Sequence, residues 1–207
     1  MSTAATHFSP LIVGIGGSTR ADSTSERVMR ACLAHAERLG ARTVAIAGEQ
    51  LRLPLYEADP GQRTPAATEL VSAVAAADGL VIVSPGYHGG ISGLVKNALD
   101  YVEDLRSHRQ PYLDGRAVGC VATAAGWQAA GSTLQALRAV VHALRGWPTP
   151  LGVPVNTELP VWGKDGTPSD PRLVAQLEIV TGQVVEFARR WLRADAMATV
   201  AEADQRV

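Results

Sequence analysis

The stretch "LIVGIGGSTRADSTSERVMRACLAHAERLG", residues 11–40, contains two kinds of apolar pattern separated by small residues. It opens on a continuous apolar run, Leu11–Ile15, which is typical of a strand covered on both faces. Glycines, hydroxyl residues and an arginine follow. Residues 25–39 then place apolar side chains at helical spacing, and Gly40 closes the segment as a C-terminal glycine does. The sequence therefore predicts a strand, a loop of small residues and a helix.

The same alternation continues along the chain. Strand patterns recur at residues 42–47, 79–84, 117–124 and 150–155, and helix patterns at 65–77, 92–105, 132–144 and 170–192. Five strands alternating with five helices predict one parallel sheet with helices on both faces. Two prolines in the last strand favour a sheet edge. We expect a single domain over residues 1–194 and a frayed tail over 195–207.

The composition is that of a globular protein without a strongly charged surface. Apolar residues make up 46% of the 207 and charged residues 19%, and 19 basic against 20 acidic residues give a net charge of −1. Near-neutrality argues against nucleic acid or a membrane surface as partner. The start of the chain lacks a secretory pattern. Cys32 and Cys120 lack metal-ligand spacing, so we expect core thiols, no metal site and a cytoplasmic location.

Three loops rich in glycine and small polar residues follow the first, third and fourth strands, at residues 16–25, 84–93 and 123–132. The carboxyl ends of parallel strands meet at one edge of the sheet, where such folds bind ligands. The three loops are therefore predicted to lie together around one site.

The first loop does not match the common nucleotide motifs. No lysine lies near it, which excludes the Walker pattern. Gly14 and Gly16 match the first two glycines of the dinucleotide-binding fingerprint, but Thr19 stands in place of the third. A monophosphate at the first helix N-terminus is the favoured ligand, because several side chains can donate hydrogen bonds there: Ser18, Arg20, Ser23, Thr24 and Ser25. The alternative is that Ser25 only caps the helix and Arg20 is a solvated charge.

The second loop and the helix after it, "SPGYHGGISGLVKNALDY" (residues 84–101), carry a specific resemblance. The chain resembles the NAD(P)H-dependent FMN reductases of flavodoxin-like fold, whose second motif is matched by ten residues: Ser84, Pro85, Tyr87, His88, Ile91, Gly93, Lys96, Asn97, Asp100 and Tyr101. Gly17, Ser18, Arg20, Ser23 and Ser25 match its first motif. The resemblance implies an αβα sandwich with five parallel strands in the order 2-1-3-4-5.

The resemblance also implies binding roles. The serines and the arginine of the first loop, with Thr24, would surround the FMN phosphate. Pro85, Gly86, Tyr87, His88 and Gly89 would lie along the isoalloxazine edge. Gly126 and Trp127 would approach the other end of the ring from the third loop.

Two features depart from the family or invite other interpretations. The family more often has asparagine at position 88, so His88 could tune the flavin or act as a general acid, although a hydrogen-bonding or surface role is favoured. Lys96 and Asp100 lie four residues apart, which favours a pair on the helix surface over catalysis.

The resulting hypothesis is an enzyme that passes a hydride from NAD(P)H to FMN and onward to a small acceptor, such as free flavin or a quinone. Chemistry would take place on flavin N5, with no catalytic side chain. A flavodoxin-type electron carrier and a flavoenzyme for one dedicated metabolite are the alternatives. The resemblance, with surplus apolar residues on 92–105, predicts a homodimer or homotetramer, and a flavin-using monooxygenase is one candidate partner.

Overall fold

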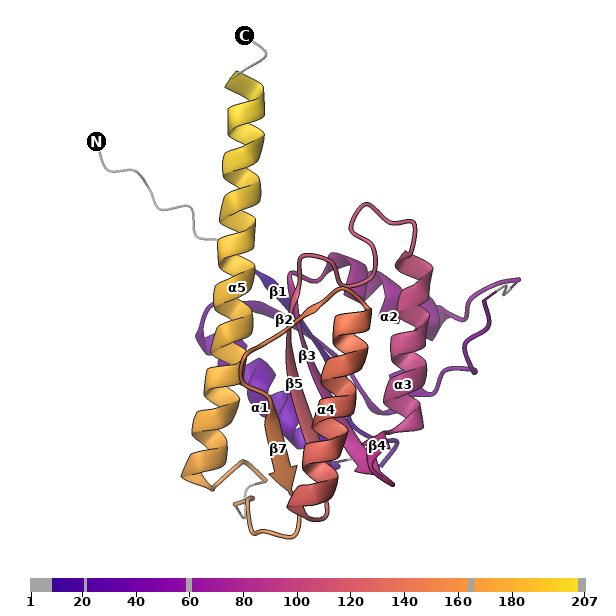
Figure 1. Cartoon of the computed structure of the whole chain (residues 1–207), viewed down its shortest axis with the longest axis vertical. Helices are drawn as coiled ribbons and strands as arrows, with labels where there is room; N and C mark the ends of the chain where they lie inside the picture. The colour runs from indigo at the N-terminus through magenta and orange to yellow at the C-terminus, as the bar shows by residue number, and fades with distance from the viewer. Residues whose placement is uncertain (1–8, 21, 59–60, 164–165, 205–207) are drawn as a thin grey trace.

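The computed structural model describes residues 9–20, 22–58, 61–163 and 166–204 as an α/β sandwich (Figure 1). Its central sheet is built from β1 (Leu11–Gly16), β2 (Arg42–Ile46), β3 (Gly79–Tyr87), β5 (Ala117–Ala124), β6 (Trp147–Pro148) and β7 (Val153–Asn156). These strands run parallel in the order β2-β1-β3-β5-β6, with β7 also paired to β5. The expected order and fold class are confirmed.

The sheet has seven strands where five were expected. The fifth position is divided, because β6 pairs with the start of β5 and β7 pairs with its end. Pro150 lies in the break between them. The seventh strand, β4 (Gly90–Ile91), folds back antiparallel to the end of β3.

Helices cover both faces of the sheet. One face carries α1 (Thr24–Arg38) and α5 (Pro171–Asp204), and the other carries α2 (Pro65–Ala76), α3 (Gly93–Asp100) and α4 (Trp127–Ala143) (Figure 1). Alternate residues of each strand supply the two cores. In β3, for example, Leu80 and Ile82 pack toward α2 and α3, whereas Val81 and Val83 pack toward α1 and α5. Two short 3₁₀ helices, Gly48–Leu51 and Tyr101–Leu105, complete the chain's helical elements in the described residues.

Three helix boundaries differ from expectation. The helix expected over 92–105 is α3 followed by a 3₁₀ turn, and Val95, Leu99 and Val102 are buried in the core rather than left over. The helix expected from residue 132 begins at Trp127, so most of the third loop is helical. The last helix continues to Asp204 instead of ending at Leu192, because the alanine-rich sequence after Leu192 sustains helix well (Figure 1).

Both cysteines lie in the core, as expected. Burial raises the pKa of the Cys32 thiol to about 11 and that of Cys120 to about 12. Within the described residues, no helix is long and apolar enough to cross a membrane.

Candidate functional site

The first loop begins where β1 and β3 approach each other closely. A Cβ on Gly16 would lie 2.3 Å from the Val83 carbonyl oxygen, so only glycine fits there. Gly17 donates its N–H to the same oxygen at 3.3 Å. This contact turns the chain away from the sheet and places Ser18 and Arg20 at the carboxyl end of the strands.

The loop ends in a capped helix. Ser23, rather than Ser25, is the N-cap of α1, and its Oγ accepts a hydrogen bond from the N–H of Glu26 at 3.3 Å. The hydroxyls of Ser23 and Ser25 lie 3.3 Å apart, and both residues are buried. Glu26 pairs with Arg30 at 2.7 Å, which offsets its negative charge beside the helix N-terminus. The positive end of α1 is therefore free to attract an anion.

Two further side chains of this loop remain available. Ser18 Oγ accepts from the backbone N–H of Arg20 at 3.2 Å and keeps its own O–H to donate. Ser18 is half-buried, whereas Arg20 is exposed and its guanidinium makes no ion pair with the described residues. Such donors suit a phosphate group.

The second loop is a tight hairpin. Tyr87 pairs with Gly90, and the two residues between them have positive φ, 52° at His88 and 84° at Gly89. This is the pattern of a type I′ turn. The buried Ser84 holds the hairpin to the next helix, because its Oγ accepts from the N–H of Ser92 at 3.0 Å.

The start of α4 lies against this hairpin and against β7. A Cβ on Gly86 would lie 2.4 Å from Thr133 Oγ1, so the close packing of β3 on α4 requires glycine. On the other side, the buried Asn156 side chain accepts from the N–H of Gly126 at 2.9 Å and from that of Glu158 at 3.0 Å. Asn156 thereby fixes the turn before α4.

These segments enclose an open cleft of about 670 Å³. Eight of the predicted site residues line it: Ser18, Arg20, Ser23, Thr24, Ser25, Pro85, Gly86 and Tyr87. Five further residues that were not among the predicted site residues also line it: Thr19, Thr123, Ala124, Ala125 and Thr157. Thr157 directly follows β7, and its position after the last expected strand is the sequence feature that could have indicated it.

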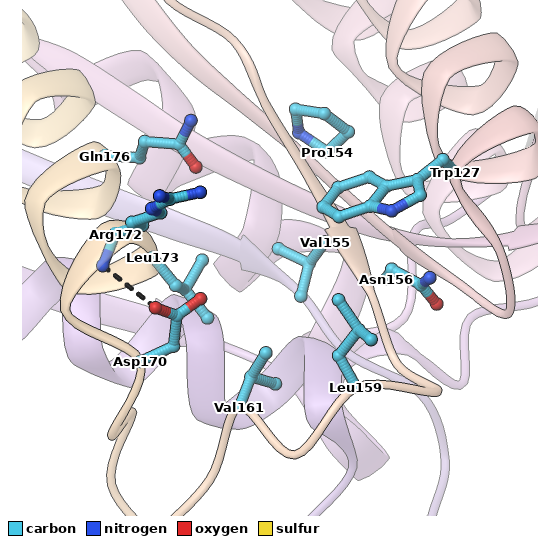
Figure 2. Close-up of a pocket in the computed structure, with 10 residues that line it drawn as sticks. All are labelled: Trp127, Pro154, Val155, Asn156, Leu159, Val161, Asp170, Arg172, Leu173 and Gln176. Carbon is cyan, nitrogen blue, oxygen red and sulfur yellow. Dashed lines mark hydrogen bonds between the residues drawn. The ribbon is translucent and has the colours of Figure 1, made fainter.

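Four predicted residues do not line the cleft. His88 and Gly89 form the hairpin tip, and Gly126 precedes the first turn of α4. Trp127 faces a second pocket, which it shares with residues of β7 and α5 (Figure 2). Their contact with a flavin remains a prediction.

The rest of the second motif holds a loop in place. The Asn97 amide donates to the carbonyl of Pro54 at 2.8 Å and accepts from the N–H of Tyr56 at 2.9 Å, and the Tyr101 hydroxyl donates to Pro54 at 3.1 Å. Lys96 and Asp100 pair at 2.5 Å on an exposed helix surface, as expected. These residues are structural in this chain.

Comparison with known proteins agrees with this geometry. Residues 10–158 match the family model described as NADPH-dependent FMN reductase. An FMN-dependent NADPH-azoreductase of Staphylococcus haemolyticus is 29% identical over 143 residues, covering 65% of this chain and 72% of the relative. An NADPH azoreductase from Bacillus sp. (strain OY1-2) is 42% identical over 60 residues, so the match spans 28% of this chain and about a third (34%) of that relative's length.

Among solved structures, the flavoenzyme NAD(P)H:(acceptor) oxidoreductase FerB from Paracoccus denitrificans superposes with a TM-score of 0.71. It is 19% identical, and the match covers 87% of this chain and 98% of that one. At this identity the likeness supports the fold alone. The family match therefore rests on the sequence, and the cleft described above is the candidate site.

Proposed function

Since the chain belongs to the NADPH-dependent FMN reductase family, it is an FMN-dependent oxidoreductase that uses NAD(P)H, and we propose that its FMN lies in the cleft described above. The observation that carries this assignment is the grouping of hydroxyl donors and Arg20 at the open N-terminus of α1. The cleft volume of about 670 Å³ also falls in the usual range for cofactor sites.

The first loop would hold the FMN phosphate. Ser18 is half-buried and keeps its O–H to donate, and the exposed Arg20 guanidinium makes no ion pair with the described residues. Ser23 and Ser25 are buried at the helix start, with hydroxyls that can turn toward an anion. The dipole of α1 and the backbone N–H groups at its N-terminus also favour a negative charge there. The donor set fits one terminal phosphate, which predicts a preference for FMN over riboflavin.

The second and third loops would support the flavin ring. Pro85, Gly86 and the half-exposed Tyr87 line the cleft beyond the phosphate end, with Ala124 and Ala125 from the third loop. Small residues at these positions let a flat ring approach the backbone. His88 and Gly89 would act through the shape of the hairpin, and Gly126 and Trp127 through the shape of the turn before α4.

When bound, FMN supplies the chemistry by accepting a hydride from NAD(P)H and passing electrons to an acceptor. The protein's own task is to fix the phosphate, support one side of the ring and leave the other side accessible. We propose a small planar acceptor such as free flavin, a quinone or an azo compound, because the cleft is open and the relatives are named azoreductases.

Steady-state turnover tests this assignment. Purified protein should oxidise NADPH or NADH when supplied with FMN together with menadione or an azo dye. Arg20→Ala should raise the FMN concentration needed for half-maximal rate, and the matched control Arg109→Ala, at an exposed arginine far along the chain, should not. If the protein bound FMN but oxidised neither NADPH nor NADH with any of these acceptors, an electron-carrier function would be favoured instead.

We also propose a cytoplasmic homo-oligomer, with a flavin-using monooxygenase as a candidate partner from family resemblance. The surface that supports assembly is not the 92–105 helix but a cluster of three aromatic rings. Phe187 stacks on Trp191 with ring centroids 5.9 Å apart and packs at a tilt against Trp147 with centroids 6.1 Å apart. Trp147 is 57% exposed. Light scattering that finds only a 21.8 kDa monomer at micromolar concentration would contradict the assembly.

A further inference from the structure

A second pocket, of about 300 Å³, is lined by residues of α4, β7 and α5 and of the segment between β7 and α5 (Figure 2). Neighbouring residues of two segments face opposite ways: Ala125 lines the cleft and Trp127 the pocket, while Thr157 lines the cleft and Asn156 the pocket. The Asn156 side chain ties these two segments together. The two cavities are therefore separate sites with a common wall.

The walls of this pocket are mainly apolar. Val155, Val161 and Leu173 are buried around it, and Leu159 and Trp127 expose 44% and 57% of their surface. The indole of Trp127 lies across the pocket from α5 (Figure 2). It stacks on no aromatic ring in the described part of the chain. An exposed indole beside buried aliphatic side chains is a surface that an aromatic ring would cover.

One side of the pocket carries a positive charge, that of Arg172. The Arg172 guanidinium extends from the first turn of α5 toward the gap between Gln176 and Pro154 (Figure 2). Its side chain makes no hydrogen bond or ion pair with the described residues. The nearby Asp170 carboxylate accepts from the backbone N–H of Arg172 at 3.0 Å, so the positive end of α5 offsets its charge.

We propose that this pocket binds a small aromatic carboxylate, with its ring against Trp127 and its acid group on Arg172. A guanidinium binds a carboxylate through two parallel hydrogen bonds, and the ring would remove the exposed indole and Leu159 from water. The pocket volume suits one or two fused rings. This binding does not depend on FMN, because the ligand occupies the other side of the wall.

Calorimetric titration of the full chain with 1-naphthoate tests the proposal, with naphthalene-1-methanol as the uncharged probe. We expect one 1-naphthoate per chain, with the same affinity whether or not FMN is saturating. Arg172→Gln should weaken 1-naphthoate about tenfold or more and leave the alcohol within about twofold, since only the acid needs the guanidinium. Leu159→Trp, at an exposed position, should fill the pocket and weaken both probes.

Arg193→Gln is the matched control, because Arg193 is an exposed arginine of the same helix outside the pocket. It should leave both affinities unchanged. Three results would overturn the proposal: no binding at millimolar 1-naphthoate, displacement of the probe by FMN, or equal weakening by Arg172→Gln and Arg193→Gln. Displacement by FMN would place the probe in the cleft and leave the proposed reductase function intact.

Discussion

Replacing His88 with asparagine tests whether this histidine supplies a proton or only shapes a turn. His88 and Gly89 are the two central residues of the hairpin between Tyr87 and Gly90, and both have positive φ. Asn-Gly is the preferred pair at these positions of a type I′ turn. The turn therefore gives a structural reason for the asparagine that the family more often has at this position.

The effect on stability can be estimated from the backbone. A left-handed conformation costs an ordinary L-residue about 1–2 kcal/mol, but asparagine and histidine tolerate it better than most. His88→Asn should thus leave the free energy of unfolding within about 0.5 kcal/mol of wild type or raise it. His88→Val should lower it by about 1–2 kcal/mol, because a β-branched residue is poorly tolerated there. Urea unfolding measures both, with His108→Asn in an exposed loop as control.

The effect on catalysis follows from position. His88 does not line the cleft, and hydride transfer from nicotinamide needs no proton from the protein in its first step. The rate of FMN reduction by NADPH in His88→Asn should stay within about tenfold of wild type, whereas losing a general acid costs about 10²–10⁴-fold. Anaerobic stopped-flow bleaching of bound FMN at saturating NADPH measures this rate. A hundredfold loss with FMN still bound would refute the turn-shaping role.

Three other variants or conditions test the supporting structure. Asn156→Ala leaves two backbone N–H groups without an acceptor and should lower the free energy of unfolding by roughly 1–3 kcal/mol in urea, whereas Asn156→Asp keeps the acceptor and should cost less. Asn97→Ala releases residues 53–56, so trypsin should cut the loop at Arg52 faster than in wild type; an unchanged rate would show that Asn97 does not hold the loop. The raised pKa values of Cys32 and Cys120 mean that the native state binds more protons than the unfolded state at high pH. The contribution of these thiols to the free energy of unfolding should be fully present below their ordinary pKa of 9.0 and should decrease as the pH rises toward about 11. In a Cys32→Ala, Cys120→Ala double variant, the free energy of unfolding should decrease less over this pH range.

The sequence predicts the architecture well because the strands are continuous apolar runs bounded by glycine. Leu11–Ile15 and residues 117–124 could hardly form anything but buried parallel strands, and their loops had to meet at one edge. Helix ends were harder to place. Gly131 marks residues 123–132 as a loop by composition, yet it lies inside α4, since the only turn needed is at Gly126.

Site residues could be predicted where the local sequence pattern fixes their position in the fold. They could not be predicted where contacts between distant segments fix it. Ser18 and Arg20 come shortly after β1, Tyr87 ends β3, and all three line the cleft. The resemblance implies that Trp127 approaches the flavin, and the structure shows it at the start of α4, lining the pocket across from α5 (Figure 2). The cap at Ser23 shows the same limit, because three neighbouring hydroxyl residues could each have started the helix.

Parallel titrations of the apoprotein with FMN and riboflavin, followed by flavin fluorescence, test most directly whether the first loop holds a phosphate. FMN should bind more tightly by about 1–3 kcal/mol, which is roughly fivefold to 150-fold, the scale of hydrogen bonds to a charged group. The double variant Ser18→Ala, Arg20→Ala should remove most of that difference while leaving riboflavin affinity unchanged. Equal affinities of the wild-type protein for the two flavins would contradict the account.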